Sequence, residues 1–251
     1  KLQFDHRNTQ LHDLDDGLLT DYDDSLKQYQ KEHNLTIFHL MGQHVSYNFR
    51  YRANQAKFWA SSYEDKRPEL SVKQRKVLSY YDNATLYNDS IVAQIVKRFQ
   101  KQNAIVIYVP DHGEECYEEN RGFICRNHSA DIDWPLAHYE FEIPFWIYCS
   151  PKYIKTHRDI YRQIRKAKDK RYMTDALPHL LLYLAGIETP TYKEEYNILS
   201  PKYDEMRPRI LKNSADYDKL RDTHNAKIAK EKEAEEAKEK AQKKTKKKKK
   251  Q

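Results

Sequence analysis

Long apolar runs, glycine and a recognisable leader are what this sequence lacks. No stretch approaches the roughly 18 consecutive apolar residues of a membrane-spanning helix. Only 5 of the 251 residues are glycine, which excludes collagen-like repeats and glycine-rich linkers. The first five residues (KLQFD) contain no Met and no run of apolar residues, so they predict no signal peptide. We therefore expect the chain to be a piece of a longer protein, whose compartment must be inferred from other features.

Cysteine is also sparse, and its spacing excludes zinc-finger motifs. None of the 3 cysteines forms a Cys-x2-Cys pair. Cys116 and Cys125 flank a polar, Gly-containing loop, where they would form a disulfide in an oxidising compartment or remain two free thiols; the sequence leaves both open. Cys149 ends an apolar run and is expected to be a small core residue.

Excess positive charge is absent from most of the chain. The net charge is +7, but residues 212–251 contain 15 Lys and Arg against 8 Asp and Glu, which leaves 30 charges of each sign in residues 1–211. Because residues 1–211, the body of the chain, carry no net charge, they do not indicate nucleic-acid binding. No nucleic acid is therefore expected as a partner. The tail has too few apolar residues to be buried and predicts a solvated, disordered or part-helical extension.

What the body does contain is an alternation of apolar strands and helices. Strand, helix and strand in succession, with fully apolar strands, predict an α/β fold: a three-layer αβα arrangement with one mainly parallel central sheet. We expect one domain over residues 1–211, in which Ile210 and Leu211 are the last apolar positions, followed by the charged tail 212–251. The predicted strands are 35–41, 104–109 and 144–149, and the main predicted helices are 13–33, 81–102 and 176–185.

Two of the predicted strands end in residues that suit a divalent metal. His44 follows the first strand, and Asp111 and His112 follow the second. Carboxylate oxygen with imidazole nitrogen suits zinc or manganese better than magnesium. Adjacent residues of a regular strand point to opposite faces, so we expect Gly113 to break the strand. Taken alone, Asp111-His112-Gly113 is equally compatible with a turn. His128 lies in a polar loop and, taken alone, is equally compatible with an ordinary surface histidine.

Several segments together resemble a known family. Residues 38–44 (FHLMGQH), 81–89 (YDNATLYND), 111–114 (DHGE), 144–146 (PFW) and 175–187 (DALPHLLLYLAGI) match in kind and order. Over about residues 13–211 the chain resembles the C-terminal part of lipid A or lipopolysaccharide phosphoethanolamine transferases, sulfatase-type members of the alkaline phosphatase superfamily.

The resemblance implies a function and a site. Asp111 and His112 would bind the catalytic zinc, and His44 and His128 would contact the phosphate or a second metal. The full-length protein would move phosphoethanolamine from a phospholipid to lipid A or the lipopolysaccharide core. It would be held in the inner membrane by a segment outside this chain, with its catalytic domain facing the periplasm. We expect the four residues to converge on one cleft.

The resemblance also implies parts that this sequence does not show. The family's threonine nucleophile and a glutamate ligand are expected upstream, and Thr9 matches no motif. Arg52 stands where these proteins usually carry proline. We therefore expect the chain alone to be inactive and to bind zinc weakly.

Three other hypotheses remain open. A sulfatase-superfamily hydrolase or a phosphoglycerol transferase would share the Asp-His pair. An anionic-surface or nucleic-acid binder would depend on the basic tail. A purely structural domain would bind no metal. His39, His138 and His179 are read as structural, since His39 lies within a strand-like run and His179 in an apolar helix.

Overall fold

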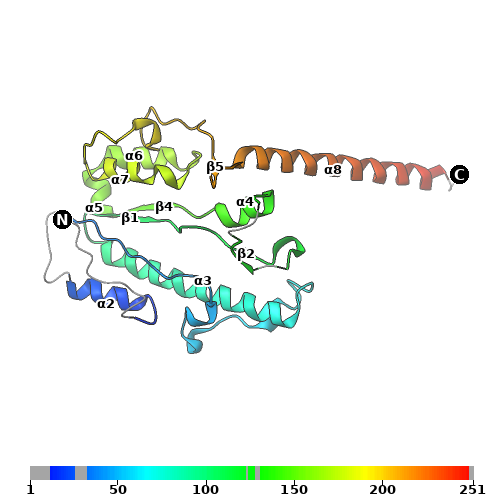
Figure 1. Ribbon diagram of the computed structural model, residues 1–251, viewed down its shortest axis with the longest axis horizontal. Coiled ribbons are helices and arrows are strands. Elements are labelled where there is room, and N and C mark those ends of the chain that lie inside the picture. Colours follow the sequence, from blue (N-terminus) through cyan, green and yellow to red (C-terminus); the bar gives the residue numbers. More distant parts are fainter. Residues whose placement is uncertain (1–11, 26–32, 123, 128–130, 249–251) are drawn as a thin grey trace. The chain divides into compact units, whose positions relative to one another are not determined.

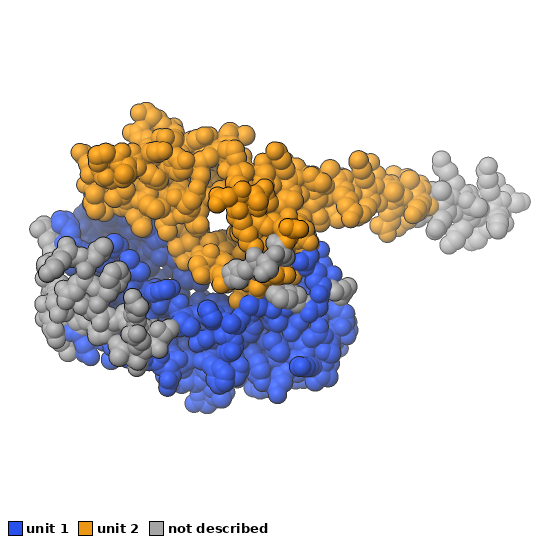
Figure 2. All heavy atoms as spheres, in the orientation of Figure 1, with its two compact units in different colours: residues 1–108, 116–125, 146–157 blue, residues 109–115, 126–145, 158–251 orange. Residues whose placement is uncertain are grey.

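The computed structural model describes residues 12–25, 33–122, 124–127 and 131–248 (Figure 1). The chain forms two compact units, each assembled from three segments (Figure 2). Unit 1 comprises residues 1–108, 116–125 and 146–157, and unit 2 comprises residues 109–115, 126–145 and 158–251. Both helices and strands are present, as the α/β prediction requires. In the part of the chain described, no helix is long and apolar enough to cross a membrane.

The long helix α3 (Val72–Phe99) organises unit 1. Ser71 begins it with a capping box, in which the Ser71 hydroxyl accepts the Gln74 backbone N–H and the Gln74 side chain accepts that of Ser71. Buried apolar side chains of α3 belong to two hydrophobic clusters. One of these clusters also includes Leu19 of α2 (Asp16–Ser25). The other elements of this unit are η1 (Tyr47–Phe49), η2 (Ala53–Gln55), η3 (Ala60–Tyr63), η4 (Glu118–Asn120), β1 (Ile105–Tyr108), β3 (Ile124–Cys125), β4 (Trp146–Cys149) and α5 (Pro151–Thr156).

Strand pairing differs from the prediction. β1 and β4 form an antiparallel pair, with Ile105 opposite Cys149 and Tyr108 opposite Trp146, where we expected parallel neighbours. The sequence could not show this, because parallel and antiparallel pairing bury the same apolar side chains.

The segment predicted as the first strand, 35–41, is extended but is not a strand. Its side chains divide: Phe38 and Leu40 pack against the core of unit 1, whereas Leu35 and Ile37 are 75% and 77% exposed. A strand needs a hydrogen-bonded neighbour, and an apolar run does not provide one. The prediction of three strands in one sheet is therefore wrong for this segment.

The cysteine loop forms a small hairpin. β2 (Glu115–Cys116) pairs with β3, which places the two cysteine-bearing strands side by side. Cys116, Cys125 and Cys149 are free thiols in the structure. A disulfide between the first two stays a prediction for an oxidising compartment. Burial raises the pKa of the Cys149 thiol, which fits its predicted core position.

Unit 2 is mainly helical. Leu136 of α4 (Trp134–Phe141) and Leu180 of α7 (Leu177–Leu184) are completely buried. Gly186, at φ 65°, ends the last helical turn of α7, as the sequence predicted. Asp175, two residues before this helix, makes a bidentate ion pair with Arg207 (2.6 and 2.7 Å). The remaining elements are α6 (Arg158–Ala167), η5 (Thr174–Ala176), η6 (Glu194–Tyr196), β5 (Ile210–Leu211), β6 (Ala215–Asp216) and α8 (Tyr217–Lys248).

The packed body continues beyond the predicted boundary at Leu211. Tyr217, the first residue of α8, is buried and packs with Ala137 and Leu211. Leu220 packs against the same cluster. The charged composition concealed this, because an amphipathic helix needs only a few apolar positions in its first turns to dock.

Candidate functional site

The predicted metal-binding pair follows β1 directly. β1 ends at Tyr108, and Pro110 has no backbone N–H with which to continue a ladder. The chain bends at Asp111. The strand therefore ends before Asp111, not at Gly113 as the sequence analysis expected.

The two side chains are held in a definite arrangement. Asp111 Oδ1 accepts the backbone N–H of His112 (3.1 Å), which leaves Oδ2 directed elsewhere. His112 Nδ1 lies 2.7 Å from the carbonyl oxygen of Gly113. Since a carbonyl only accepts, Nδ1 must carry the proton, and Nε2 keeps its lone pair. A hydrogen bond of this kind, made by the ring nitrogen that does not bind the ion, orients a histidine for metal binding through Nε2.

The free atoms of the pair fit one zinc ion. Asp111 Oδ2 and His112 Nε2 lie 3.6 Å apart. Two tetrahedral ligands with bonds of about 2.0–2.1 Å have their ligating atoms about 3.3 Å apart, so a small adjustment would suffice. The Asp111 side chain is 87% exposed and that of His112 is 21% exposed, so the pair is accessible. Among the described residues, no group of three or more His, Cys, Asp or Glu side chains is placed to hold a metal.

Helix α4 fixes the segment that carries the pair. The backbone N–H of Gly113 donates to the carbonyl oxygen of Glu140 (2.9 Å). A Cβ on Gly113 would lie 2.3 Å from the Tyr139 carbonyl oxygen, so only glycine allows this approach. The buried Glu140 carboxylate also accepts the backbone N–H of Asn127 (2.6 Å). Glu140 thus anchors the segment of Asp111 and the residue that precedes His128.

A second anchored turn carries His44 in unit 1. The buried carboxylate of Asp15 accepts the backbone N–H groups of Met41 (3.0 Å) and Gly42 (2.9 Å). The Arg50 guanidinium donates to the carbonyl oxygens of His44 and Val45, each at 2.9 Å. The turn is therefore fixed from both sides, while the His44 side chain is exposed.

The structure brings together only part of the predicted site. Asp111 and His112 are adjacent in unit 2, His44 belongs to unit 1, and His128 lies outside the described residues. Convergence of all four on one cleft stays a prediction.

Sequence reasoning missed the residues that hold these segments. Asp15 lies within the segment predicted as helix 13–33 and was given no role, and Glu140 belongs to a helix that was not predicted. No local pattern links residue 15 with residues 41 and 42, because the contact is made only in the folded chain.

Two of the three histidines predicted to be structural, His138 and His179, are partly exposed and make packing or hydrogen-bonding contacts. His138 stacks on Trp134, with ring centroids 5.4 Å apart, and its Nδ1 lies 2.9 Å from a Glu142 carboxylate oxygen. His179 Nδ1 accepts the backbone N–H of Lys193 (3.1 Å). His39 is exposed.

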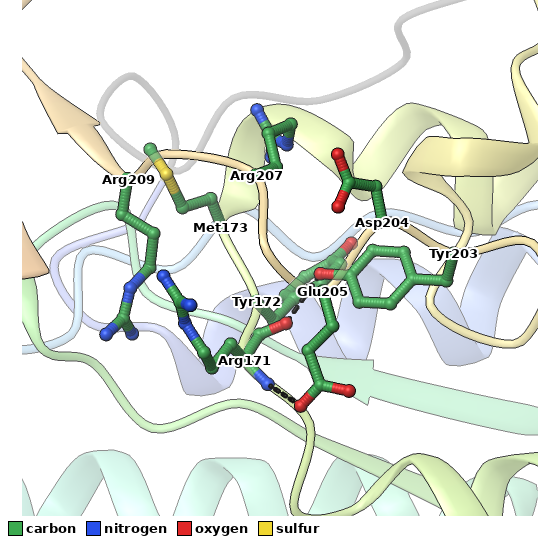
Figure 3. Close-up of a pocket in the computed structure, with 8 residues that line it drawn as sticks. All are labelled: Arg171, Tyr172, Met173, Tyr203, Asp204, Glu205, Arg207 and Arg209. Atoms are coloured by element: carbon green, nitrogen blue, oxygen red, sulfur yellow. Dashed lines mark hydrogen bonds between the residues drawn. The ribbon is translucent and has the colours of Figure 1, made fainter.

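A small arginine-lined cavity in unit 2 is not a substrate site (Figure 3). Its volume is about 10 Å³, enough for about one water molecule. Arg207 is paired with Asp175, while Arg171 and Arg209 are both paired with Asp218. The hydrogen bond from Arg209 holds the pKa of the Asp218 carboxyl below its usual range. The cavity is lined by Arg171, Tyr172, Met173, Tyr203, Asp204, Glu205, Arg207 and Arg209.

The chain is similar to known proteins along most of its length. The family model described as Sulfatase matches residues 3–187. Phosphoethanolamine transferase EptC of Escherichia coli (strain K12) is 33% identical over 194 residues, covering 74% of this chain and 32% of the relative. Kdo(2)-lipid A phosphoethanolamine 7''-transferase of the same organism is 27% identical, covering 61% of this chain and 26% of the relative.

A solved structure agrees. The C-terminal periplasmic domain of EcEptC from Escherichia coli, in complex with Zn, has a TM-score of 0.67 and 28% sequence identity, covering 88% of this chain and 59% of that chain. The chain spans about a third of the length of the relatives it matches. The match to the solved domain confirms the sulfatase-like α/β fold. The chain belongs to the sulfatase family.

Proposed function

We propose that the protein containing this chain transfers phosphoethanolamine from a phospholipid to lipid A or the lipopolysaccharide core, at a metal site that includes Asp111 and His112. The observation that carries the proposal is the prearranged pair: Oδ2 and Nε2 lie 3.6 Å apart, and the other atom of each side chain is hydrogen-bonded to backbone. Support comes from relatives named as phosphoethanolamine transferases.

The pair would hold zinc, with manganese as the alternative that its oxygen and nitrogen donors also suit. When bound, the cation lowers the pKa of a nucleophile and neutralises charge on phosphoryl oxygens. Asp111 would contribute one negative charge and one oxygen ligand. His112 would contribute a neutral nitrogen ligand whose tautomer Gly113 fixes.

His44 and His128 would act on the phosphate group. An imidazole N–H donates a hydrogen bond to a non-bridging phosphoryl oxygen and stabilises the charge that develops there. His44 suits this role because its side chain is exposed while its backbone is held by Arg50. The resemblance implies a threonine nucleophile and a glutamate ligand, which we assign to no residue of the described chain.

The substrates and the location follow from the same proposal. A phospholipid donor and a lipid A acceptor are both membrane lipids, so the catalytic domain would face the periplasm and be held at the inner membrane. The relative solved with Zn is itself described as a periplasmic domain.

A sulfate-ester hydrolase or a phosphoglycerol transferase is the competing function, since the matching family model is described only as Sulfatase. The whole protein, purified with its native metal, should be incubated with head-group-labelled phosphatidylethanolamine and lipid A. We expect labelled lipid A, loss of activity on chelation, and recovery with zinc. Release of sulfate from an aryl sulfate, or transfer from phosphatidylglycerol alone, would contradict the proposal.

Asp15→Asn is expected to lower transfer in the whole protein by about 10- to 100-fold. The amide can accept one of the two backbone N–H groups, but its NH2 group then faces the other donor, so the turn before His44 shifts. Steady-state transfer rates and metal content measure this, and metal content should not change.

A double-mutant cycle separates positioning from general destabilisation. If Asp15 acts through His44, His44→Ala should add little further loss in the Asp15→Asn background. Asp24→Asn, at an exposed position of the helix α2 that follows Asp15, is the matched control and should leave transfer unchanged. Fully additive losses would argue against the positioning role.

A further inference from the structure

All of the chain's excess charge lies in its last eleven residues. Residues 241–251 contain seven lysines and no acidic residue, while residues 1–240 contain 38 basic and 38 acidic side chains. The lysine run, defined as residues 243–250, follows a stretch in which Lys and Glu alternate without net charge. Charge is thus segregated at one end of α8 rather than distributed along it.

The other end of α8 is anchored to unit 2. Tyr217 donates a hydrogen bond to Glu142, and burial together with this bond raises the pKa of Tyr217 to about 12. Asp218 is paired with Arg209 at 2.6 Å, and Trp134 stacks on His224 with centroids 5.3 Å apart. These contacts hold the first two turns of the helix against α4.

Beyond Ile228 the helix leaves the body of unit 2. Ile228 is half-buried, and every residue from 229 to 240 is exposed. At 1.5 Å per residue, the twenty residues of α8 that follow Ile228 extend about 30 Å. Figure 2 shows this part of unit 2 as an arm without neighbouring atoms from the rest of the unit.

This arm is suited to hold the lysine run away from unit 2, and it is not suited to pack against another helix. Lys227 with Glu231 (3.9 Å) and Glu236 with Lys240 (3.4 Å) form i,i+4 pairs that stabilise an isolated helix. Alanine is the only apolar residue type from 229 to 251, so there is no seam for a coiled coil. The remaining source of attraction is the positive charge of the lysine run.

We infer that α8 carries the lysine run to the surface of an anionic phospholipid bilayer, where the lysines bind lipid phosphates. Clusters of four to eight basic residues bind such surfaces, and each residue strengthens binding about fivefold. The choice of a membrane rests on the proposed function, because a periplasmic enzyme of membrane lipids meets anionic headgroups and not nucleic acid. The inference adds a surface for the bilayer, separate from the metal site.

The test uses the 251-residue chain with vesicles of 30% phosphatidylglycerol in phosphatidylcholine, and with phosphatidylcholine alone. We expect binding only to the anionic vesicles, weakening strongly between 0.1 and 0.5 M salt. Replacing the seven lysines of the run by Gln should weaken binding on the order of 100-fold. A loss of this size corresponds to about three lysines in contact with the membrane surface. Replacing them by Arg should preserve binding, and circular dichroism should show the same helix content in both variants.

Binding that survives the Gln replacements, or no binding by the unaltered chain, would overturn the inference. Lysine-dependent binding to duplex DNA without lysine-dependent binding to vesicles would assign the run to nucleic acid instead. The measurement needs neither metal nor a donor lipid and should be insensitive to chelation. Its failure would therefore leave the transfer reaction intact, and failure of the transfer assay would leave measured vesicle binding intact.

Discussion

Asp111→Ala in the whole protein is expected to abolish metal binding and to lower transfer by on the order of a thousandfold or more. The substitution removes an oxygen ligand and its negative charge, and the electrostatic contribution of a catalytic metal amounts to several kcal/mol. It also frees the His112 backbone N–H that Asp111 Oδ1 accepts. Metal content by mass spectrometry and the labelled-lipid assay measure the two effects.

His112→Ala should have the same effect, because it removes the nitrogen ligand whose proton Gly113 fixes on Nδ1. Asp169→Ala is the matched control: its side chain is 84% exposed in the same unit and pairs with the neighbouring Lys168 at 3.6 Å. The control should keep its metal and its activity. If the enzyme stays active with Asp111 and His112 both replaced, the metal assignment is wrong and the proposed function falls with it.

Gly113→Ala is expected to destabilise the protein by about 2–3 kcal/mol and to reduce metal affinity 10- to 100-fold. The added Cβ would lie 2.3 Å from the Tyr139 carbonyl oxygen, and both atoms belong to backbone, so no side-chain rotation relieves the overlap. The segment must move away from α4, which weakens the Gly113–Glu140 hydrogen bond and displaces the adjacent His112. Denaturant unfolding and zinc titration of the whole protein measure the two effects.

Gly186→Ala separates loss of stability from loss of the site. Gly186 has a φ of 65° and nothing within 4 Å of its Cβ position, so Ala should cost about 1–2 kcal/mol through backbone strain alone. Its metal affinity should be unchanged. Equal losses of metal affinity in both variants would show that the Gly113 effect reflects general destabilisation.

The sequence predicted those features that depend on residues close to one another along the chain. The periodicity of α3 predicted a helix, although the Ser71–Gln74 box starts it nine residues before the predicted residue 81. Gly186 marked the end of α7 because a left-handed residue there favours glycine. Asp111 and His112 are adjacent, so the motif itself was enough to name them as the candidate metal-binding pair.

The tertiary structure decided what depends on residues far apart in the chain. The antiparallel pairing of β1 with β4, the exposure of Leu35 and the docking of Tyr217 were not readable from composition, because apolar runs specify burial and not the partner that provides it. Asp15 holds a turn 26 residues away, and Glu140 holds two segments at once. Such hydrogen bonds form only after the helices have packed. The sequence by itself therefore indicated the candidate ligands and the family, and only the folded chain determined which backbone groups hold the candidate residues in place.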